Sequence, residues 1–463
     1  MAMTETIEMV KYKPPIGSGV MALEQYAVAE LTESKHDLAI ALEIKSRLSE
    51  AGFGFDQRSW LVSPGTCHFS GDIAEQINYR SGLLGVYLPI AEQILNDKYG
   101  GPPPKLWGLP YREKPHGATI VRFDDILMPN GQLLATEAEG WSSGQGQIIA
   151  MSNLYRLVAG KDGLSTPFGG IDLAAVKTFK ESFGDQAKIA IVLPAAEVYG
   201  LDFLWKDFQL FCHYCRQLGL DIQVESVAAL NINDYDVLYP FFPPTAYADE
   251  ATTFGKGEAI LKAWADGKVE LFPEPSWLQT KLITTVMFEP QYSQFFPDAE
   301  LLFPWSCALD KHNQPNVNWS DNTWVAKPLF GTDCSGLVFS SEMSPNEWQD
   351  FVDQKLQSFK SDQPYPLQFG EVDKHRRAGA NVELDFDNYF VQPELPHANF
   401  KVKYLNPSGS GIRQKDGFSA RICSTVFIDN QGRVEVGDVD VTLRKNIRVH
   451  GATDSVVTLA TFG

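Results

Sequence analysis

Three carboxylates in the first third of the chain have the spacing of magnesium ligands. Asp124 comes at the end of a strand-like run, and Glu137 and Glu139 follow it after a turn signal. Residues two apart on a strand share one face, so Glu137 and Glu139 are expected to point the same way, beside Asp124 on the neighbouring strand. Carboxylates on one face repel one another unless a cation lies between them, and magnesium (Mg2+) takes such ligands together with the phosphates of ATP. The plainer interpretation is a solvated hairpin with ordinary surface acids.

A lysine and a glycine-containing loop much later in the chain have the chemistry of a phosphate site. Lys327 ends an apolar run and is followed by a loop that contains Gly331 and Gly336. The ammonium group can neutralise phosphate charge while backbone N–H groups of the loop donate to phosphate oxygens. Lys281, at the start of a helical stretch, is a second candidate contact to phosphate or adenine, although an ordinary surface lysine is an equally open interpretation.

The segment Tyr389–Glu394 is a hydrophobic strand that runs into a polar stop. Such a strand could carry backbone groups to the edge of an adenine and an acidic side chain to a ribose. Gln392 and Glu394 are therefore candidate nucleotide contacts. The plainer interpretation is an edge strand.

Two arginines lie at strand positions among apolar residues near the end of the chain. Arg421 and Arg444 need anionic partners if they are buried. They could stabilise charge that develops on a transferred phosphoryl group or on an acyl phosphate. The alternative is that they pair with structural carboxylates such as Asp438 or Asp440.

The order of these motifs resembles that of the circularly permuted ATP-grasp proteins, a group that includes glutathionylspermidine synthase-like ligases. In the usual ATP-grasp order the lysines come first and the metal-binding Glu-x-Asn comes last, whereas here the metal-type segment precedes the lysines. In the permuted group an Arg-x-Asp strand leads to a Glu-x-Asn strand. The segment Arg122–Asp124 fits the first, and Glu137–Glu139 fits the second with Glu in place of Asn. The resemblance spans about residues 118–451 and includes the late segments Thr442–Arg444 and Val449–Gly451.

This resemblance implies an α/β (α+β) fold of the circularly permuted ATP-grasp type and a carbon–nitrogen ligase. ATP would phosphorylate a substrate carboxylate, and an amine would then displace the phosphate to give an amide. It implies Arg122, Arg421 and Arg444 as catalytic residues and ATP and magnesium as cofactors. Small-molecule acid and amine substrates, of an amino-acid or peptide-like kind, would be the partners. A small-molecule kinase and a non-catalytic nucleotide-binding protein of the same fold remain alternatives.

The elements that must position these residues can be read from hydrophobic periodicity. Helical patterns cover residues 20–50 and 72–95, and an Asn130-Gly131 turn between two apolar runs predicts a hairpin. A strand–helix–strand rhythm predicts a small parallel α/β unit at about 187–275. Strands dominate after residue 323, with a helix at 345–358. We therefore expect a helical, possible substrate-binding region at 1–117, a metal-binding part at 118–186, the α/β unit at 187–275 and nucleotide-binding lobes at 276–463.

Other segments contain residue types that are common in functional sites. The glycine-rich stretch Gly140–Gly146 follows the acidic strand and would let the backbone approach a ligand. Cys212 and Cys215 form a CxxC motif, but they lie inside an amphipathic helix, where buried structural thiols are expected. The adjacent pair Cys67 and His68 is a minor candidate for a nucleophile and its base. The polar residues of 63–80, including Arg80, could contribute to an acceptor or carboxylate pocket, although loop polar residues are more often simply solvated.

Composition narrows the class of protein further. The 463 residues carry a net charge of −19, which argues against a broad nucleic-acid surface. No run of about 18 apolar residues occurs, and the start of the chain has no apolar signal core, so we expect neither a membrane span nor a membrane partner. Six cysteines in a chain of this length fit reduced thiols. These features predict a cytoplasmic protein, and nothing in the sequence indicates its oligomeric state.

Overall fold

The computed structural model describes residues 34–50, 60–113, 116–140, 142–159, 166–194, 202–241, 247, 253–310, 319, 323–329, 336–359, 388–445 and 455–463. Residues 20–33 of the first expected helix, Gly331 and the segment Val449–Gly451 lie outside these ranges. No helix in the described ranges is both long enough and apolar enough to cross a bilayer.

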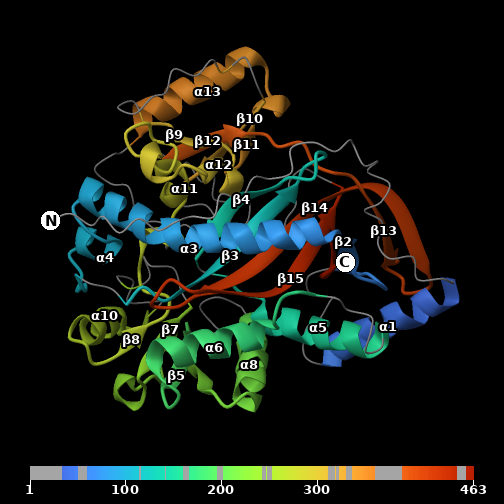
Figure 1. The fold of residues 1–463 in the computed structure, drawn as a ribbon, viewed down its shortest axis with the longest axis horizontal. Helices are drawn as coiled ribbons and strands as arrows, with labels where there is room; N and C mark the ends of the chain where they lie inside the picture. Colours follow the sequence, from blue (N-terminus) through green and yellow to red (C-terminus); the bar gives the residue numbers. More distant parts are fainter. Residues whose placement is uncertain are drawn as a thin grey trace.

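An eight-stranded sheet built from both ends of the chain forms the centre of the molecule (Figure 1). Its main path runs β1-β16-β15-β14-β3-β4, with β13 paired to β14 and β2 paired to β16. The antiparallel pair β3 and β4 confirms the hairpin that the Asn-Gly turn predicts. The strands are β1 Leu61–Val62, β2 Cys67–Phe69, β3 Thr119–Leu127, β4 Leu133–Glu139, β13 Phe400–Leu405, β14 Ile412–Ile428, β15 Val434–Arg444 and β16 Val456–Phe462.

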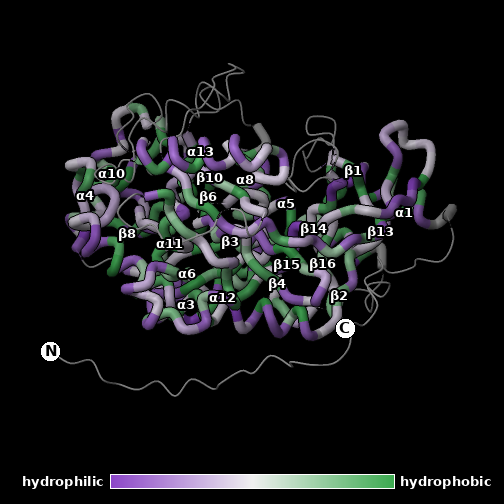
Figure 2. Tube along the Cα trace, turned by 90° about the horizontal axis from the view of Figure 1, so that it is seen from above, coloured by the Kyte–Doolittle hydropathy of each residue, from purple (hydrophilic) through white to green (hydrophobic). Residues whose placement is uncertain are grey.

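Helices cover both faces of this sheet. Successive side chains of a strand point to opposite faces, so each face carries apolar side chains that a helix can bury. The long helix α3, Gly71–Tyr99, crosses one face (Figure 1) and packs Leu84 and Tyr87 into a core that includes Val121 and Phe123. The other face packs Ile120 against α5, Gln145–Ala159, and α6, Ile171–Phe183, and α1, Ser34–Glu50, joins the same core. Figure 2 colours the chain by hydropathy and shows both hydrophobic (green) and hydrophilic (purple) stretches along the labelled helices and strands. Odd-numbered residues of β3 thus face α3, and even-numbered ones face the opposite side.

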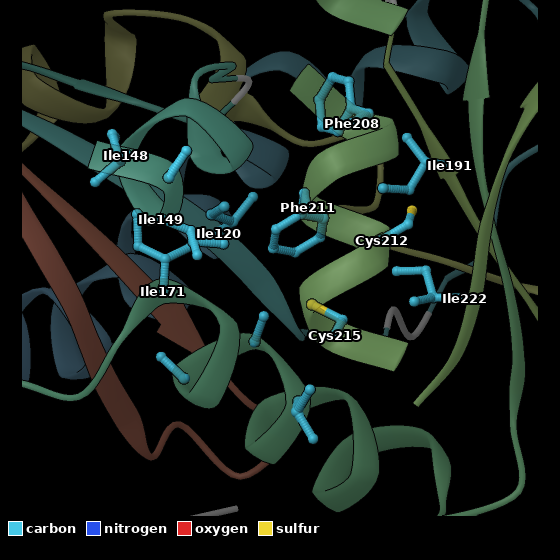
Figure 3. Close-up of a cluster of buried hydrophobic side chains, with 14 of the residues drawn as sticks. Ile120, Ile148, Ile149, Ile171, Ile191, Phe208, Phe211, Cys212, Cys215 and Ile222 are labelled. Atoms are coloured by element: carbon cyan, nitrogen blue, oxygen red, sulfur yellow. The ribbon is translucent and has the colours of Figure 1, made fainter. Parts of the chain in front are cut away.

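A second sheet is the small parallel α/β unit that the sequence predicts. Its four strands run in the order β6-β5-β7-β8, all parallel, and each pair lies between residues 187 and 275. Cys212 and Cys215 are free, buried thiols that pack with Phe208 and Phe211 (Figure 3), as expected for a structural CxxC. The elements are β5 Lys188–Leu193, α8 Asp202–Gln217, β6 Asp221–Ser226, β7 Val237–Pro240, α10 Gly257–Ala265 and β8 Glu270–Leu271.

A third, antiparallel sheet has the order β11-β10-β12-β9. Strand β12 lies between β10 and β9, so the interpretation of Tyr389–Glu394 as an edge strand is wrong. Helix α13 covers one face and begins with a capping box between Ser344 and Glu347. The elements of this part are β9 Cys307–Ala308, β10 Trp324–Pro328, β11 Val338–Phe339, α13 Pro345–Ser358 and β12 Tyr389–Pro393. Three short α-helices lie elsewhere in the described ranges: α4 Pro103–Leu106, α11 Leu282–Val286 and α12 Ala299–Leu302.

The glycine-rich stretch after β4 is explained by contacts within the chain. A Cβ on Gly140 would meet the Leu278 side chain at 2.6 Å, and one on Gly146 would meet the Asp207 carbonyl oxygen at 2.0 Å. The Asp207 carboxylate also accepts from the N–H groups of Gly144 and Gln147, both at 2.8 Å, at the start of α5. These two glycines therefore allow close packing of α5 and of the Leu278 segment, which differs from the ligand approach expected from sequence.

Gly146→Ala is expected to lower the free energy of unfolding by about 1–3 kcal/mol, because the new methyl group would overpack the α5–α8 contact. Gly82 is the matched control, since it lies in α3 with no atom within 4 Å of the position that a methyl group would occupy, and Ala is the better helix former. Gly82→Ala is expected to raise the free energy of unfolding by about 0.5–1 kcal/mol. Urea denaturation measures both, and a neutral Gly146→Ala would contradict the tight contact.

Candidate active site

The β3–β4 hairpin brings four charged residues to one face of the central sheet. Arg122 lies directly opposite Glu139, and Asp124 lies directly opposite Glu137. The register shifts just beyond Asp124, where Thr136 has no partner in the ladder and its hydroxyl donates to the Asp124 carbonyl at 3.1 Å. The shared face expected for Glu137 and Glu139 is thus present.

Asp124 is held by arginines on both sides. Its Oδ1 accepts from Arg122 Nε at 2.8 Å, and its Oδ2 accepts from Arg122 Nη2 at 3.2 Å and from Arg421 Nη1 at 3.0 Å. Burial disfavours the charged carboxylate, but Arg122 and Arg421 outweigh it and hold the pKa of Asp124 well below its usual range. The carboxylates expected to need a bound cation therefore already have cationic side chains as partners.

The two glutamates also pair with basic side chains, but in a more exposed setting. Glu139 Oε2 lies 2.5 Å from Arg122 Nη2, and Glu137 Oε2 lies 3.5 Å from Lys281 Nζ. The glutamate side chains are 27% and 28% exposed, against 6% for Asp124. Within the described ranges, no group of three or more His, Cys, Asp or Glu side chains is arranged to hold a metal ion by itself. Magnesium ligation by Asp124, Glu137 and Glu139 remains a prediction.

Two further residues of this face were not predicted as site residues from the sequence, where Asp440 was considered only as a structural partner of the late arginines. Cys423 and Asp440 lie directly across the sheet from Asp124, so that Asp440, Cys423, Asp124 and Glu137 form one row over β15, β14, β3 and β4. Cys423 Sγ is 3.6 Å from Asp124 Oδ1. Burial raises the pKa of Asp440 to about 6, against the lowering effect of Arg421. Only the strand register reveals this row, since no local motif marks either residue.

The raised pKa of Asp440 makes a prediction about stability. Between the ordinary Asp pKa of about 4 and the folded value of about 6, the folded protein keeps a proton that the unfolded chain has released. The contribution of Asp440 to stability is therefore full below about pH 4 and is lost as the pH rises through 6. Asp440→Asn is expected to remove about 1–3 kcal/mol of the fall in unfolding free energy between pH 4 and 7, measured by urea denaturation. Asp416→Asn, at an exposed site on β14, is the control, and equal pH slopes in Asp440→Asn and wild type would contradict this role.

Lys327 and Lys281 reach the hairpin from the third sheet and from α11. Lys327 Nζ donates to the Thr136 carbonyl oxygen at 2.9 Å, across 191 positions of sequence. The Lys281 N–H donates to the Leu329 carbonyl at 3.1 Å, which fixes the start of α11 beside the end of β10. Both lysines and Glu137 are thereby brought to one junction between the two sheets, and in Figure 1 the third sheet lies beside β4.

The other nucleotide candidates lie on or near β10 and β12. Gln392 shares a face with Lys327, because Lys327 opposes Phe390 and Gln392 is two residues further along β12. Gln392 is 1% exposed, and its Oε1 has no hydrogen-bond partner among the residues that the structure describes. Glu394 Oε2 accepts from Ser341 Oγ at 2.8 Å. Gly336 has a φ of 71°, the left-handed conformation that favours glycine, at the end of the loop.

The two late arginines take different positions. Arg421 lies in the Asp124 cluster, and its Nε is buried with no hydrogen-bond partner within the described part of the chain. Arg444 lies opposite Ser419 at the end of β15, two residues beyond Thr442, which is the cross-strand neighbour of Arg421. The structure thus places Arg421 among the residues around Asp124 and places Arg444 further out along the same face.

The N-terminal candidates lie outside this cluster. Cys67 is buried and His68 is exposed on β2, so adjacent side chains point to opposite faces, and burial raises the pKa of the Cys67 thiol to about 12. Arg80 donates to Asp125 Oδ1 at 2.7 Å on the α3 side of the sheet. Because Asp125 and Asp124 face opposite sides, Arg80 lies across the sheet from the Asp124 cluster, and its part in a substrate pocket remains a prediction.

Comparison with known proteins supports the fold. No protein-family model matches the chain, and no curated protein matches it in sequence. A glutathione synthetase-like effector from Globodera pallida, solved in its apo form, is similar in structure with a TM-score of 0.57 and 14% sequence identity, over 95% of this chain and 100% of the effector. A Methylobacillus flagellatus KT protein, provisionally described as a gamma-glutamylcysteine synthetase, has a TM-score of 0.37 and 11% identity over 80% of this chain and 83% of its own, too low to bear on the fold.

The likeness to the effector shows a shared fold. The mixed α/β class expected from the sequence is confirmed by the three sheets and their helices. The ATP-grasp assignment and the permuted motif order remain predictions.

Proposed function

We propose that this protein is an ATP-dependent carboxylate–amine ligase of the circularly permuted ATP-grasp type. The proposal rests on the junction between the third sheet and the β3–β4 hairpin. Lys327 contacts Thr136 and Lys281 contacts Glu137, so the phosphate-type lysines and the metal-type hairpin meet although they are far apart in sequence. Lysines that can bind phosphates lie here beside carboxylates that can bind magnesium, and this combination fits a magnesium nucleotide.

The nucleotide would lie between the third sheet and the β3–β4 hairpin. Lys281 and Lys327 would hold its phosphates, with the loop that contains Gly331 and Gly336 beside them. Gln392 and Glu394 would contact the base and the ribose from β12. The Oε1 of buried Gln392, which has no hydrogen-bond partner among the described residues, and the face that Gln392 shares with Lys327 support this orientation.

Glu137 and Glu139 would supply protein ligands to magnesium, and the nucleotide phosphates would supply others. Magnesium usually takes only one or two carboxylates from a protein in nucleotide sites, which fits the two more exposed glutamates. When bound, it would neutralise charge between the phosphate groups. Asp124, with its oxygens engaged by guanidinium groups, would instead fix Arg122 and Arg421 in place.

The chemistry proposed is amide formation through an acyl phosphate. A substrate carboxylate oxygen attacks the terminal phosphorus of ATP, and the bond to the bridging oxygen breaks to release ADP. Arg421 and Arg122 would hold the charge of the transferred phosphoryl group, and Arg444 would contact the substrate further out along β15. An amine then attacks the acyl carbon, phosphate leaves, and the amine proton passes to solvent.

An amino-acid or peptide-like acid and a small amine are the proposed substrates. The similar effector is described as glutathione synthetase-like, and a peptide-type ligase would share that class of chemistry. We also propose that 118–186 is the metal-binding part of the ligase core, that 276–463 forms its nucleotide-binding lobes, and that 1–117 contributes to substrate binding.

A non-catalytic nucleotide-binding protein is the second candidate. It is favoured by Glu139, which stands where the permuted group has Asn and which pairs with Arg122. In such a protein the hairpin would be neutralised internally and would not turn over ATP.

Phosphate release from ATP and magnesium, measured across pooled acids and pooled amines, tests the ligase. Wild type is expected to release phosphate only when both an acid and an amine are present, and Lys327→Ala and Glu137→Ala are expected to abolish release. Lys401→Ala, at an exposed site on β13, is the control and should match wild type. Release with one hydroxylated compound alone would indicate a kinase, and ATP binding without release from any pool would favour the non-catalytic protein.

A further inference from the structure

We propose that Glu137 and Glu139 stand in for phosphate groups in the nucleotide-free protein, and that magnesium draws them away from Lys281 and Arg122. Magnesium and ATP would then each bind weakly alone and strongly together. This inference rests on the proposed function, since it describes how the same site is loaded.

The geometry separates two kinds of ion pair at this site. The pairs Glu137–Lys281 and Glu139–Arg122 leave every side chain between 15% and 28% exposed. The Arg80–Asp125 pair on the other face is 3% and 0% exposed and also binds backbone carbonyls. Pairs that retain contact with water can exchange partners easily, whereas the fully buried pair is fixed by the desolvation cost of breaking it.

The exchange would follow from the preferences of each group. Magnesium prefers carboxylate and phosphate oxygens, and an ammonium or guanidinium group binds phosphate as readily as carboxylate. Without magnesium, the two glutamates would occupy the cations and would repel the phosphates of an incoming nucleotide. With magnesium, the same glutamates would attract the nucleotide through the ion, and Lys281 and Arg122 would donate to phosphate oxygens.

Two buried polar atoms of this region have no hydrogen-bond partner in the part of the chain that the structure describes. Gln392 is 1% exposed, and its Oε1 lacks a hydrogen-bond partner within the described ranges, on the β12 face that it shares with Lys327. Arg421 Nε is also buried and unpartnered in those ranges, beside Asp124. An unpartnered buried acceptor or donor is costly, so a ligand donor beside Gln392 and an anionic ligand oxygen beside Arg421 would each remove such a cost.

The test is calorimetric titration of ATP into wild type and into Glu137→Gln, first in EDTA and then in magnesium. Glu137→Gln removes the carboxylate charge that competes for Lys281 and would repel the phosphates, so ATP in EDTA is expected to bind the variant about two- to fivefold more tightly than wild type. In magnesium the order is expected to reverse, because the variant has lost a metal ligand. Glu435→Gln is the matched control, since Glu435 pairs with Lys177 at an exposed site on β15 and α6.

The possible outcomes distinguish a failure of the proposed partner exchange from a failure of the proposed function on which it rests. If Glu137→Gln weakens ATP binding by the same factor in EDTA and in magnesium, the exchange is overturned while the nucleotide site stands. Failure of wild type to bind ATP in magnesium would overturn the proposed function and the exchange together. Thermal unfolding checks that the variant is folded. Glu139→Gln, which removes the Glu139 charge beside Arg122 and leaves the Arg122–Asp124 pair in place, provides a second variant with the same expected reversal.

Discussion

Arg80→Met is expected to lower the free energy of unfolding by about 3–5 kcal/mol, because it leaves the Asp125 carboxylate buried without its cation. The guanidinium donates to Asp125 Oδ1 at 2.7 Å and to the carbonyls of Leu301 and Leu302, both at 2.9 Å. Both partners of the ion pair are at most 3% exposed, so water cannot replace Arg80. Burial already raises the pKa of Asp125 against the lowering effect of Arg80, and the loss of Arg80 would raise it further.

The double variant Arg80→Met, Asp125→Leu separates charge from packing. It removes both charges, so it is expected to be at least about 1 kcal/mol more stable than Arg80→Met alone, although two backbone carbonyls still lose their donor. Urea denaturation of both proteins gives the comparison. A cost below about 1 kcal/mol for Arg80→Met would contradict the buried ion pair.

Asp124→Asn is expected to reduce substrate-dependent phosphate release by at least about a hundredfold. The carboxylate is the shared partner of Arg122 and Arg421, and a neutral amide cannot hold two guanidinium groups side by side. The arginines would then repel each other, and Arg421 would no longer be fixed where charge develops on the transferred group. The same change is expected to cost about 3–5 kcal/mol of stability, since two largely buried cations lose their anion.

Asp416→Asn, on the exposed part of β14, is the control for this prediction and should leave release unchanged. Release is measured at a temperature where both variants are folded by circular dichroism. A folded Asp124→Asn protein with near wild-type release would show that the arginine pair does not act in the reaction.

The parts of the fold that were predictable from sequence have local signals. The Asn130-Gly131 turn marks the β3–β4 hairpin, and helix α13 begins and ends where its capping box and periodicity place it. The continuous apolar run of β5 and the helix that follows it indicate the parallel unit. In each case one short stretch of chain holds both the pattern and its partners.

The charge pairing of the site was not predictable because it depends on strand register between distant segments. Arg421 meets Asp124 across 297 positions, and Asp440 and Cys423 join the row only because β14 lies between β3 and β15. The Arg-x-Asp spacing selects Asp124 over Asp125, but no spacing in the sequence shows that Asp124 meets Arg421 while Asp125 meets Arg80.

The interior position of β12 was missed for a related reason. Its second neighbour, β9, is two residues long and has no recognisable strand pattern. The tight packing behind Gly140 and Gly146 was equally invisible, since it depends on Leu278 and Asp207 from other parts of the chain. Local patterns predict elements, but contacts between elements decide what the glycines and charges do.

Titration calorimetry of ATP with magnesium tests the nucleotide site most directly. Wild type is expected to show saturable binding at one site, and Lys327→Ala is expected to bind at least about tenfold more weakly, because a charge-assisted contact to phosphate is lost. Lys401→Ala should bind as wild type does. Absence of saturable binding by wild type, or equal affinity in Lys327→Ala, would contradict a nucleotide site at the junction of the two sheets.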